Sequence, residues 1–327
     1  IGPSLRHAGI LAFYPAYAYF MQLKTDLYID GKWVKGEKSL PVYNPATNEV
    51  IADVQLAGDK ECEAAVTAAH NAFPAWAKTA PRVRGEILRK AFELMIAESD
   101  TIAKIISMEN GKVLSDAKGE VAYAAEFFRW FSEEAVRIDG SVRIAPSGAN
   151  KILTYKQPIG IAFLITPWNF PAAMYTRKVG AALAAGCAAV LKPASETPLT
   201  ALAISKIMLE AGALPGTVSV LQTNKPGPLT DAALSDERVG KLSFTGSTGI
   251  GKMLLEKASP ADVQVWLLTA KAIREEMRRE VGSELPLPPR SDGDSYSDSG
   301  RDDESDIHGG GRRPSGGMPT IRNGVIH

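Results

Sequence analysis

The sequence predicts an α/β protein built around a parallel sheet, with a block of helices before the sheet and a polar tail after it. Three observations predict this class. Apolar residues recur every three or four positions between residues 59 and 139, which is typical of helices. Short apolar runs alternate with helical stretches between residues 151 and 258, which indicates βαβ units. The last 46 residues contain 9 Gly, 7 Ser and 5 Pro and few apolar side chains.

The composition excludes several classes of protein. The chain has 327 residues, of which 45% are hydrophobic and 23% are charged. Its 37 Lys and Arg residues balance 37 Asp and Glu residues, so we expect no nucleic-acid partner. Two cysteines exclude a disulfide scaffold and a Cys-rich zinc module, and the scattered positions of the four histidines argue against a metal site or a Ser-His-Asp triad.

The first 26 residues are expected to be unstructured. The apolar run 9–20 is broken by Pro15 and is shorter than the roughly 20 residues that span a membrane, so we expect no membrane partner. The chain begins with Ile1, and the sequence after Met21 is typical of folded protein. This favours a fragment or mistranslated leader for residues 1–20, with a targeting peptide as the alternative. Two cysteines indicate a reducing compartment, so we expect a cytoplasmic protein, with the mitochondrion as the alternative.

Hairpins and helices should come first in the chain. Asp30 and Gly31 stand between alternating apolar residues, which is a strong hairpin signal, and we expect residues 27–54 to pair into a small separate sheet. A helix is expected from Asp59, and another begins at Pro81, where proline is tolerated. The clearest helical pattern covers residues 115–139. We expect this helical block, residues 59–139, to pack on one side of the sheet.

The region 151–258 should form the βαβ core, with right-handed crossovers. The run from Ile161 lacks polar alternation, as expected for a strand that is buried on both faces. Further strands are expected at 188–191, 218–221 and 241–244, and helices at 172–185, 198–211, 229–234 and 250–258. Ligands of such sheets bind at the carboxyl ends of the strands.

The end of the chain differs in character. A charged helix is possible within residues 259–281, over 264–280, but no sheet is expected for it to pack against. Residues 282–327 cannot bury enough apolar surface to offset the entropy of ordering, so we expect them to be disordered.

Three loops that follow expected strands carry the candidate chemistry. In the first, residues 166–171, the side-chain amide of Asn169 could donate to a developing oxyanion, although the residues by themselves favour a packed tryptophan and a turn asparagine. In the second, Lys192 follows a buried strand and must meet an anion, a ribose or solvent. The third reads G-x-x-G-x-G from Gly246 and opens a helix, which suits a phosphate but is not the dinucleotide fingerprint.

Together the three loops resemble the aldehyde dehydrogenase superfamily, and most closely its succinate-semialdehyde dehydrogenases. The segments ITPWNFP, AALAAGCAAVLKPASETP and KLSFTGSTGIGK follow one another in the order and spacing of that family. The resemblance covers about residues 27–257 and implies a Rossmann-type cofactor domain over 27–258, the use of NAD or NADP, an aldehyde substrate and a homo-oligomer.

The resemblance also implies roles for single residues. Trp168 and Asn169 match the nicotinamide side of the cofactor site, and Asn169 matches the oxyanion amide. The segment that holds the adenine ribose corresponds to Lys192, Pro193, Ala194 and Ser195. Family members that use only NAD often have Glu where this chain has Ser195, so NADP use is plausible. The pyrophosphate contacts correspond to Gly246 and Ser247. Arg177 matches an arginine that binds the distal carboxylate of succinate semialdehyde, although a solvated helix arginine is the alternative.

The chain differs from the family in the segments that would carry the catalytic base and nucleophile. The general base lies in an E-L-G-G segment and the nucleophile in a G-Q-x-C segment, and both are absent. The catalytic domain and the oligomerisation strand are therefore expected to be missing. Cys187 lies in an apolar run and Cys62 beside carboxylates, so neither should replace the nucleophile. We expect an inactive cofactor-binding portion, caused by a frameshift, a retained intron or a faulty gene model. The alternative is a non-catalytic protein that binds nucleotide or caps an oligomer.

Overall fold

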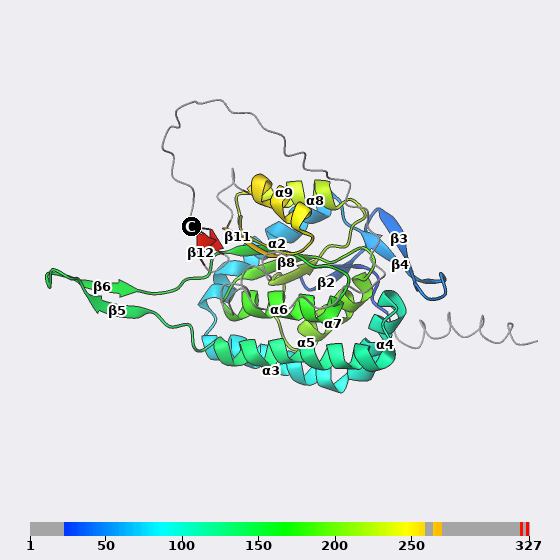
Figure 1. Cartoon of the computed structure of the whole chain (residues 1–327), viewed down its shortest axis with the longest axis horizontal. Helices are drawn as coiled ribbons and strands as arrows, with labels where there is room; N and C mark the ends of the chain where they lie inside the picture. The colour runs from blue at the N-terminus through cyan, green and yellow to red at the C-terminus, as the bar shows by residue number, and fades with distance from the viewer. Residues whose placement is uncertain (1–22, 259–263, 270–320, 323–324, 327) are drawn as a thin grey trace, which may run out of the picture.

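The computed structural model describes residues 23–258, 264–269, 321–322 and 325–326. In this part of the chain, a seven-stranded mixed sheet lies between two layers of helices (Figure 1). The order of the strands across the sheet is β11-β10-β7-β8-β9-β1-β2. Five neighbouring strands are parallel: β11 (Gln264–Thr269), β10 (Val239–Gly246), β7 (Ile161–Ile165), β8 (Ala188–Lys192) and β9 (Val218–Val220).

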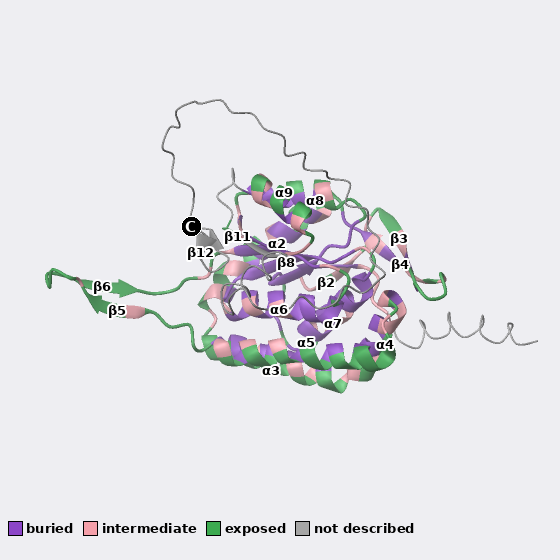
Figure 2. Cartoon of the chain, in the orientation of Figure 1, coloured by how far each residue is buried: buried purple, intermediate pink, exposed green. Residues whose placement is uncertain are grey.

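Helices cover both faces of the sheet (Figure 1). One face carries α6 (Pro171–Ala184) and α7 (Pro198–Glu210), and outside them α3 (Pro81–Ala97), α4 (Ser99–Asn110) and α5 (Leu114–Glu134). The other face carries α2 (Asp59–Lys78), α8 (Pro226–Leu234) and α9 (Thr248–Ala258). Every residue of β7 and β8 is buried, because helices lie above and below them (Figure 2). The α/β class and the buried central strands are thus confirmed.

The first strands do not form the separate sheet that we expected. Asp30 and Gly31 both have positive φ, and they close the hairpin between β1 (Leu27–Ile29) and β2 (Lys32–Val34) as the sequence indicates. This hairpin, however, joins the main sheet, where Tyr28 pairs with Val220 in antiparallel direction. All of β1 is buried, so pairing with β9 covers apolar side chains that a small sheet would expose. Of the first four strands, β3 (Lys38–Tyr43) and β4 (Val50–Leu56) do form a two-stranded sheet separate from the main one.

The helical block does not lie on one side of the sheet. Helix α2 packs on the face of α8 and α9, where Ala65, Val66 and Ala69 share an apolar cluster with Leu229 and Leu254. The helices α3, α4 and α5 contribute to the cluster on the opposite face. The proline at the start of α3 and the extended residue Thr79 before it let the chain turn between the two layers.

The expected core also begins too early in the chain. Residues 151–154 form β6 (Lys151–Thr154), which pairs with β5 (Ser141–Ile144) and not with the main sheet. This two-stranded ribbon projects away from the rest of the molecule (Figure 1). All four residues of β6 are exposed, so this strand lies outside the buried core. The first strand of the βαβ core is therefore β7.

Two expectations about the end of the chain need correction. Residues 264–269, which we expected to be helical, form β11, because this run of apolar and β-branched residues extends the parallel edge of β10. The tail 282–327 lies outside the described residues except for β12 (Ile321–Arg322) and β13 (Val325–Ile326), which pair in antiparallel direction. An Asn-Gly dipeptide separates these two strands in the sequence, and such a dipeptide favours hairpins. None of the helices in the described ranges is long and apolar enough to cross a membrane.

Candidate functional site

The three candidate loops lie side by side at one edge of the sheet. They follow β10, β7 and β8, which are adjacent and parallel, so their carboxyl ends meet there. The loops after β7 and β8 are joined directly, because the Thr166 amide donates to the Lys192 carbonyl oxygen at 3.2 Å. The fold thus brings the loops of Asn169, Lys192 and Gly246 to one edge, the position where α/β sheets bind ligands.

The turn that carries Asn169 is held from outside by the segment between α4 and α5. The side-chain amide of Asn110 donates to the Trp168 carbonyl oxygen at 2.8 Å, and the Lys112 ammonium donates to the Asn169 carbonyl oxygen at 3.0 Å. The same ammonium lies 4.0 Å from the centre of the Phe170 ring. The backbone carbonyl groups of Trp168 and Asn169 are therefore held in place, while Asn169 itself is exposed.

Glu120 links Lys112, which supports the turn, to the start of helix α6. Its carboxylate pairs with Lys112, and only 1% of the Glu120 side chain is exposed. The other carboxylate oxygen accepts the amide of Ala172 at 2.9 Å, in the first turn of α6. Glu120 therefore supplies a negative charge and an acceptor at the amino end of α6, where both are favourable. Sequence reasoning missed Asn110, Lys112 and Glu120, because these contacts join segments about 50 residues apart.

Lys192 lies at the end of β8 with only 8% of its surface exposed. Its ammonium makes no hydrogen bond or ion pair within the described residues. Burial lowers the pKa of Lys192, and the nearby Glu196 carboxylate opposes that shift. A buried cation without a hydrogen-bond partner suits a ligand that supplies oxygen acceptors, such as a ribose or a phosphate.

Ser195 is partly exposed, and its hydroxyl donates to the Glu196 carboxylate at 3.1 Å. The sequence suggested that this hydroxyl donates to a 2′-phosphate. It can do so only after leaving Glu196, whose negative charge lies in the same loop. Pro193 and Ala194 are buried and hold the loop against the sheet.

Gly246 and Ser247 connect β10 to α9. A Cβ atom on Gly246 would lie 2.5 Å from the Phe244 ring, so any other residue here would force that ring to shift. The Ser247 hydroxyl accepts the Ile250 amide at 3.4 Å, which satisfies one of the first amides of α9. The buried Thr245 hydroxyl has no hydrogen-bond partner in the structure. A helix start, a glycine and an unpartnered hydroxyl together fit the pyrophosphate of a dinucleotide.

Arg177 lies on α6, two turns after Asn169, and is partly exposed. Its guanidinium group is 5.3 Å from the centre of the Phe127 ring on α5. It makes no ion pair with any described carboxylate. An arginine that stacks on an aromatic ring keeps its forked donors available for a carboxylate.

Neither cysteine has the surroundings of a reactive thiol. Cys62 and Cys187 are free and are 1% and 4% exposed. Burial raises the pKa of Cys62 to about 12, with help from Asp236 and Asp59. Burial also raises the pKa of Cys187. Both groups are therefore protonated near neutral pH, and a protonated thiol is a poor nucleophile.

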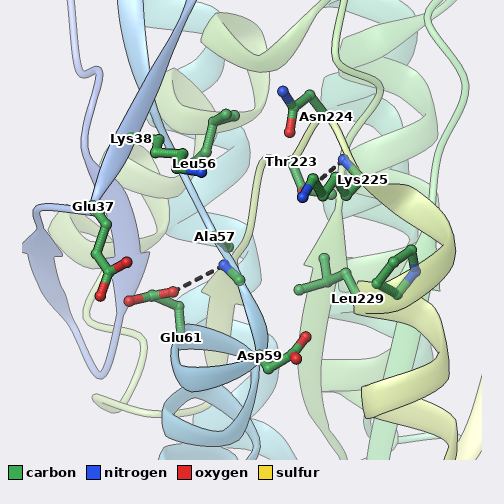
Figure 3. A pocket seen from close by; sticks show the side chains of 12 residues that line it. Glu37, Lys38, Leu56, Ala57, Asp59, Glu61, Thr223, Asn224, Lys225 and Leu229 are labelled. Atoms are coloured by element: carbon green, nitrogen blue, oxygen red, sulfur yellow. Dashed lines mark hydrogen bonds between the residues drawn. The ribbon is translucent and has the colours of Figure 1, made fainter.

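A separate small pocket lies between the start of α2, the start of β3 and the loop before α8 (Figure 3). Its volume is about 180 Å³. Glu61 accepts the Gly58 amide at 2.9 Å, and Thr223 accepts the Lys225 amide at 3.1 Å, so these two acceptors already bind backbone amides. None of the residues that the three loops supply lines this pocket. The structure also holds no group of three or more His, Cys, Asp or Glu suited to a metal among its described residues.

The comparison with known proteins decides the family. A model of the aldehyde dehydrogenase family matches residues 33–270, more than two thirds of the sequence. The chain belongs to this family. The match continues past residue 258 and includes β11, so the family resemblance extends further than the sequence suggested. The resemblance to aldehyde dehydrogenases is confirmed, and these enzymes use NAD or NADP.

Relatives of this aldehyde dehydrogenase chain include several succinate-semialdehyde dehydrogenases. The mitochondrial enzyme of Rattus norvegicus is 44% identical over 247 residues, which are 75% of this chain and 47% of the rat protein. The enzyme of Schizosaccharomyces pombe, named for NADP(+), is 45% identical over 71% of this chain and 47% of its own length. The crystal structure of the enzyme from Burkholderia pseudomallei has a TM-score of 0.73 and 42% identity, with 74% of this chain and 51% of that chain covered. The chain spans about half the length of these relatives.

Proposed function

We propose that this chain is the cofactor-binding part of an aldehyde dehydrogenase and binds NAD or NADP at the edge formed by β10, β7 and β8. One observation carries this proposal: the three loops follow adjacent parallel strands, at the edge that also holds the buried residue Lys192 and the unpartnered Thr245 hydroxyl. Lys192 and Ser195 bind the adenine ribose, with Pro193 and Ala194 shaping the loop. Gly246, Ser247 and the first amides of α9 bind the pyrophosphate. Trp168 and Asn169 contact the nicotinamide side, where the bound cofactor would accept hydride.

For the substrate, we propose succinate semialdehyde or a related aldehyde. The names of the rat, fission-yeast and Burkholderia relatives support this choice. Arg177 would bind a distal carboxylate, and the Asn169 amide would donate to the oxygen of the reacting carbonyl. Because the rat relative is named as mitochondrial, it supports the mitochondrial alternative over the cytoplasmic location that we expected.

The chain alone should bind the cofactor without oxidising an aldehyde. Aldehyde oxidation in this family needs a thiolate nucleophile and a glutamate base. The segment after α9, where the family has its glutamate, reads QVWLLT in β11 and contains no acidic residue. Both cysteines are buried and protonated, which supports their exclusion as nucleophiles.

Titration of the purified chain with NAD and NADP tests the proposal. We expect measurable binding, weaker than in an intact relative. Lys192→Ala should lower the affinity at least tenfold, about 1.4 kcal/mol, because it removes the buried cation. Lys90→Ala, an exposed lysine on the outer helix α3, is the control and should bind as the unmodified chain does. Equal binding by Lys192→Ala would remove Lys192 from the site, and no binding of either nucleotide would overturn the function.

The β5–β6 ribbon favours a second candidate function, the capping of an oligomer. Its cross-strand neighbours Val142 and Leu153 are 69% and 70% exposed, and Ile144 is 71% exposed. A row of exposed apolar side chains on a projecting ribbon is typical of a surface that another chain covers. Sedimentation of the chain with an intact relative should give mixed oligomers, and Leu153→Lys should prevent them. Ile96→Lys, at an exposed apolar residue of α3, is the control. Separate sedimentation of the two proteins would exclude this function.

A further inference from the structure

A second cavity, away from the three loops, lies between α6 and the sheet. Its volume is about 450 Å³, and α6, β7, β10 and the residue Gln264 at the start of β11 form its walls. Half of the twelve lining residues have aliphatic side chains: Ile159, Ala162, Leu164, Ala181, Ala182 and Ala185. No residue of the proposed cofactor site lines it.

Lys178 is the charged group that enters this cavity from α6. The residue is 8% exposed, and its ammonium donates to the Ser243 hydroxyl of β10 at 2.7 Å. Among the described residues that line the cavity there is no carboxylate, so Lys178 meets no counter-charge from them. The other charged groups near it are cations, Lys241 on β10 and Arg177 on its own helix. The remaining polar groups are Gln157, Gln264 and the Cys187 thiol, which are neutral.

These surroundings favour the neutral amine of Lys178. Burial, and to a smaller extent the charge of Arg177, lowers the pKa of Lys178 to about 7. Roughly half of the molecules then carry a neutral amine near pH 7, compared with fewer than about 0.1% for an ordinary lysine. A neutral lysine in an apolar pocket is a nucleophile toward carbonyl groups.

We propose that Lys178 is a covalent binding site for short aldehydes, which enter the cavity and form an imine with its side-chain amine. The amine nitrogen adds to the carbonyl carbon, and the carbonyl π electrons move to the oxygen. A proton passes from nitrogen to that oxygen and gives a carbinolamine. Loss of water, with the nitrogen lone pair forming the C=N bond, completes the imine. No oxidant or reductant is needed, and the step is reversible.

The cavity selects the class of aldehyde. Its apolar walls and modest volume suit an aliphatic chain of a few carbon atoms, and the Ser243 hydroxyl can exchange protons with the carbinolamine oxygen. This site needs neither the nucleotide nor the missing catalytic segments. Imine formation at Lys178 can therefore be tested independently of cofactor binding.

Reductive trapping of the full chain tests the proposal. The chain is incubated briefly with butanal and cyanoborohydride, and peptide mass spectrometry measures butyl groups on each lysine. At pH 7 we expect Lys178 to be modified at least about tenfold faster than Lys252, an exposed lysine of α9 that serves as the internal control. The rate at Lys178 should level off just above pH 7. Equal rates at the two lysines at pH 7, or a Lys178 rate that keeps rising well above pH 7, would overturn the proposal.

A variant makes the test specific to the cavity. Ser243→Ala removes the acceptor of the Lys178 ammonium and leaves the amine in place, so the midpoint of the Lys178 pH profile should move to lower pH. The pH profile of Lys252 should not change. A Lys178 midpoint that stays fixed would show that the reactive amine does not lie against Ser243, and it would overturn the site as described. Circular dichroism of the variant checks that the fold is retained.

Discussion

At the scale of single residues, the pair of Lys112 and Glu120 decides how the Asn169 turn is presented. The Lys112 ammonium contacts the Asn169 carbonyl oxygen, the Phe170 ring and the Glu120 carboxylate. The main-chain position of the turn therefore depends on residues of the helical layer and not on the sheet alone. The sequence could suggest Asn169, because it follows an apolar strand, but no local pattern marks Lys112 or Glu120 as its supports.

Replacing Glu120 with glutamine should destabilise the fold. The change leaves the nearly buried Lys112 ammonium without its counter-charge, which typically costs about 3 kcal/mol of the free energy of unfolding. Urea unfolding measures this. Glu126→Gln is the matched control on the same helix, because Glu126 pairs with Arg129 at 3.3 Å while both side chains are about half exposed, and it should cost under about 0.5 kcal/mol. Equal costs for the two variants would contradict a structural role for the buried pair.

Glu109 should make the stability depend on pH. Its carboxyl group is buried and accepts the amides of Leu199 and Thr200 at 2.7 and 2.8 Å, at the start of α7. Burial raises its pKa from the ordinary 4.5 to about 8. Between these values the unfolded chain has released the proton that the folded chain retains, so the contribution of Glu109 to stability falls as the pH rises.

Comparison with Glu109→Gln isolates this effect, because glutamine does not titrate and all other groups are shared. The stability of the unmodified chain should decrease relative to the variant between about pH 5 and pH 8, on the order of a few kcal/mol. Urea unfolding at several pH values measures the difference. A difference that stays constant over this range, or one that grows in favour of the unmodified chain, would mean that Glu109 is ionised in the folded protein.

At the scale of helices and strands, the sequence correctly predicted the elements that a short stretch of residues is enough to identify. The strands β7 and β8 were recognisable as short apolar runs, and the Asp30-Gly31 turn as a hairpin. Helix α4 lies inside the expected helical block but was not predicted as an element of its own, and only one residue, Glu98, separates it from α3. The partner of β1 and the layer of α2 were assigned wrongly because they depend on contacts with segments far along the chain.

The turn before β9 shows how tightly α2 packs on the sheet. Gly216 has a φ of +84°, and a Cβ atom there would lie 2.6 Å from the Ala68 carbonyl oxygen of α2. Gly212 has a φ of +92°, but a Cβ atom there would meet open space. Both alanine variants incur the conformational cost of about 1–2 kcal/mol. Gly216→Ala should lose at least about 1 kcal/mol more, because backbone must also shift. Urea midpoints of the two variants measure this, and equal midpoints would contradict the close contact.

At the scale of the whole molecule, the chain has the α/β fold of the aldehyde dehydrogenase family and spans about half the length of its relatives. The loops of the site could be predicted because all three follow apolar strands of one parallel sheet. Their mutual distances could not, since they depend on the order of the strands. The roles of the matched residues come from the family resemblance and not from local pattern.

The purified chain should therefore produce no reduced cofactor from succinate semialdehyde with NAD or NADP. Without a thiolate at the site, no tetrahedral adduct forms from which hydride can leave, and the Asn169 amide has no oxyanion to stabilise. Absorbance of the reduced cofactor measures this directly. Cys62→Ser and Cys187→Ser are the diagnostic variants: turnover abolished by either would overturn the exclusion of both cysteines. Turnover that survives both changes would be traced to a contaminating enzyme.

The antiparallel pairing of β1 with β9 has a consequence for synthesis on the ribosome. The Gln222 amide next to β9 donates to the Asp26 carbonyl oxygen next to β1, across 196 residues of chain. At about 5–20 residues per second, the β1–β2 hairpin waits roughly 10–40 s for its neighbour to emerge. During that interval its buried apolar residues and open strand edge face solvent, which is the condition that attracts chaperones. The sheet can close on this side only after nearly all of the described chain has been made.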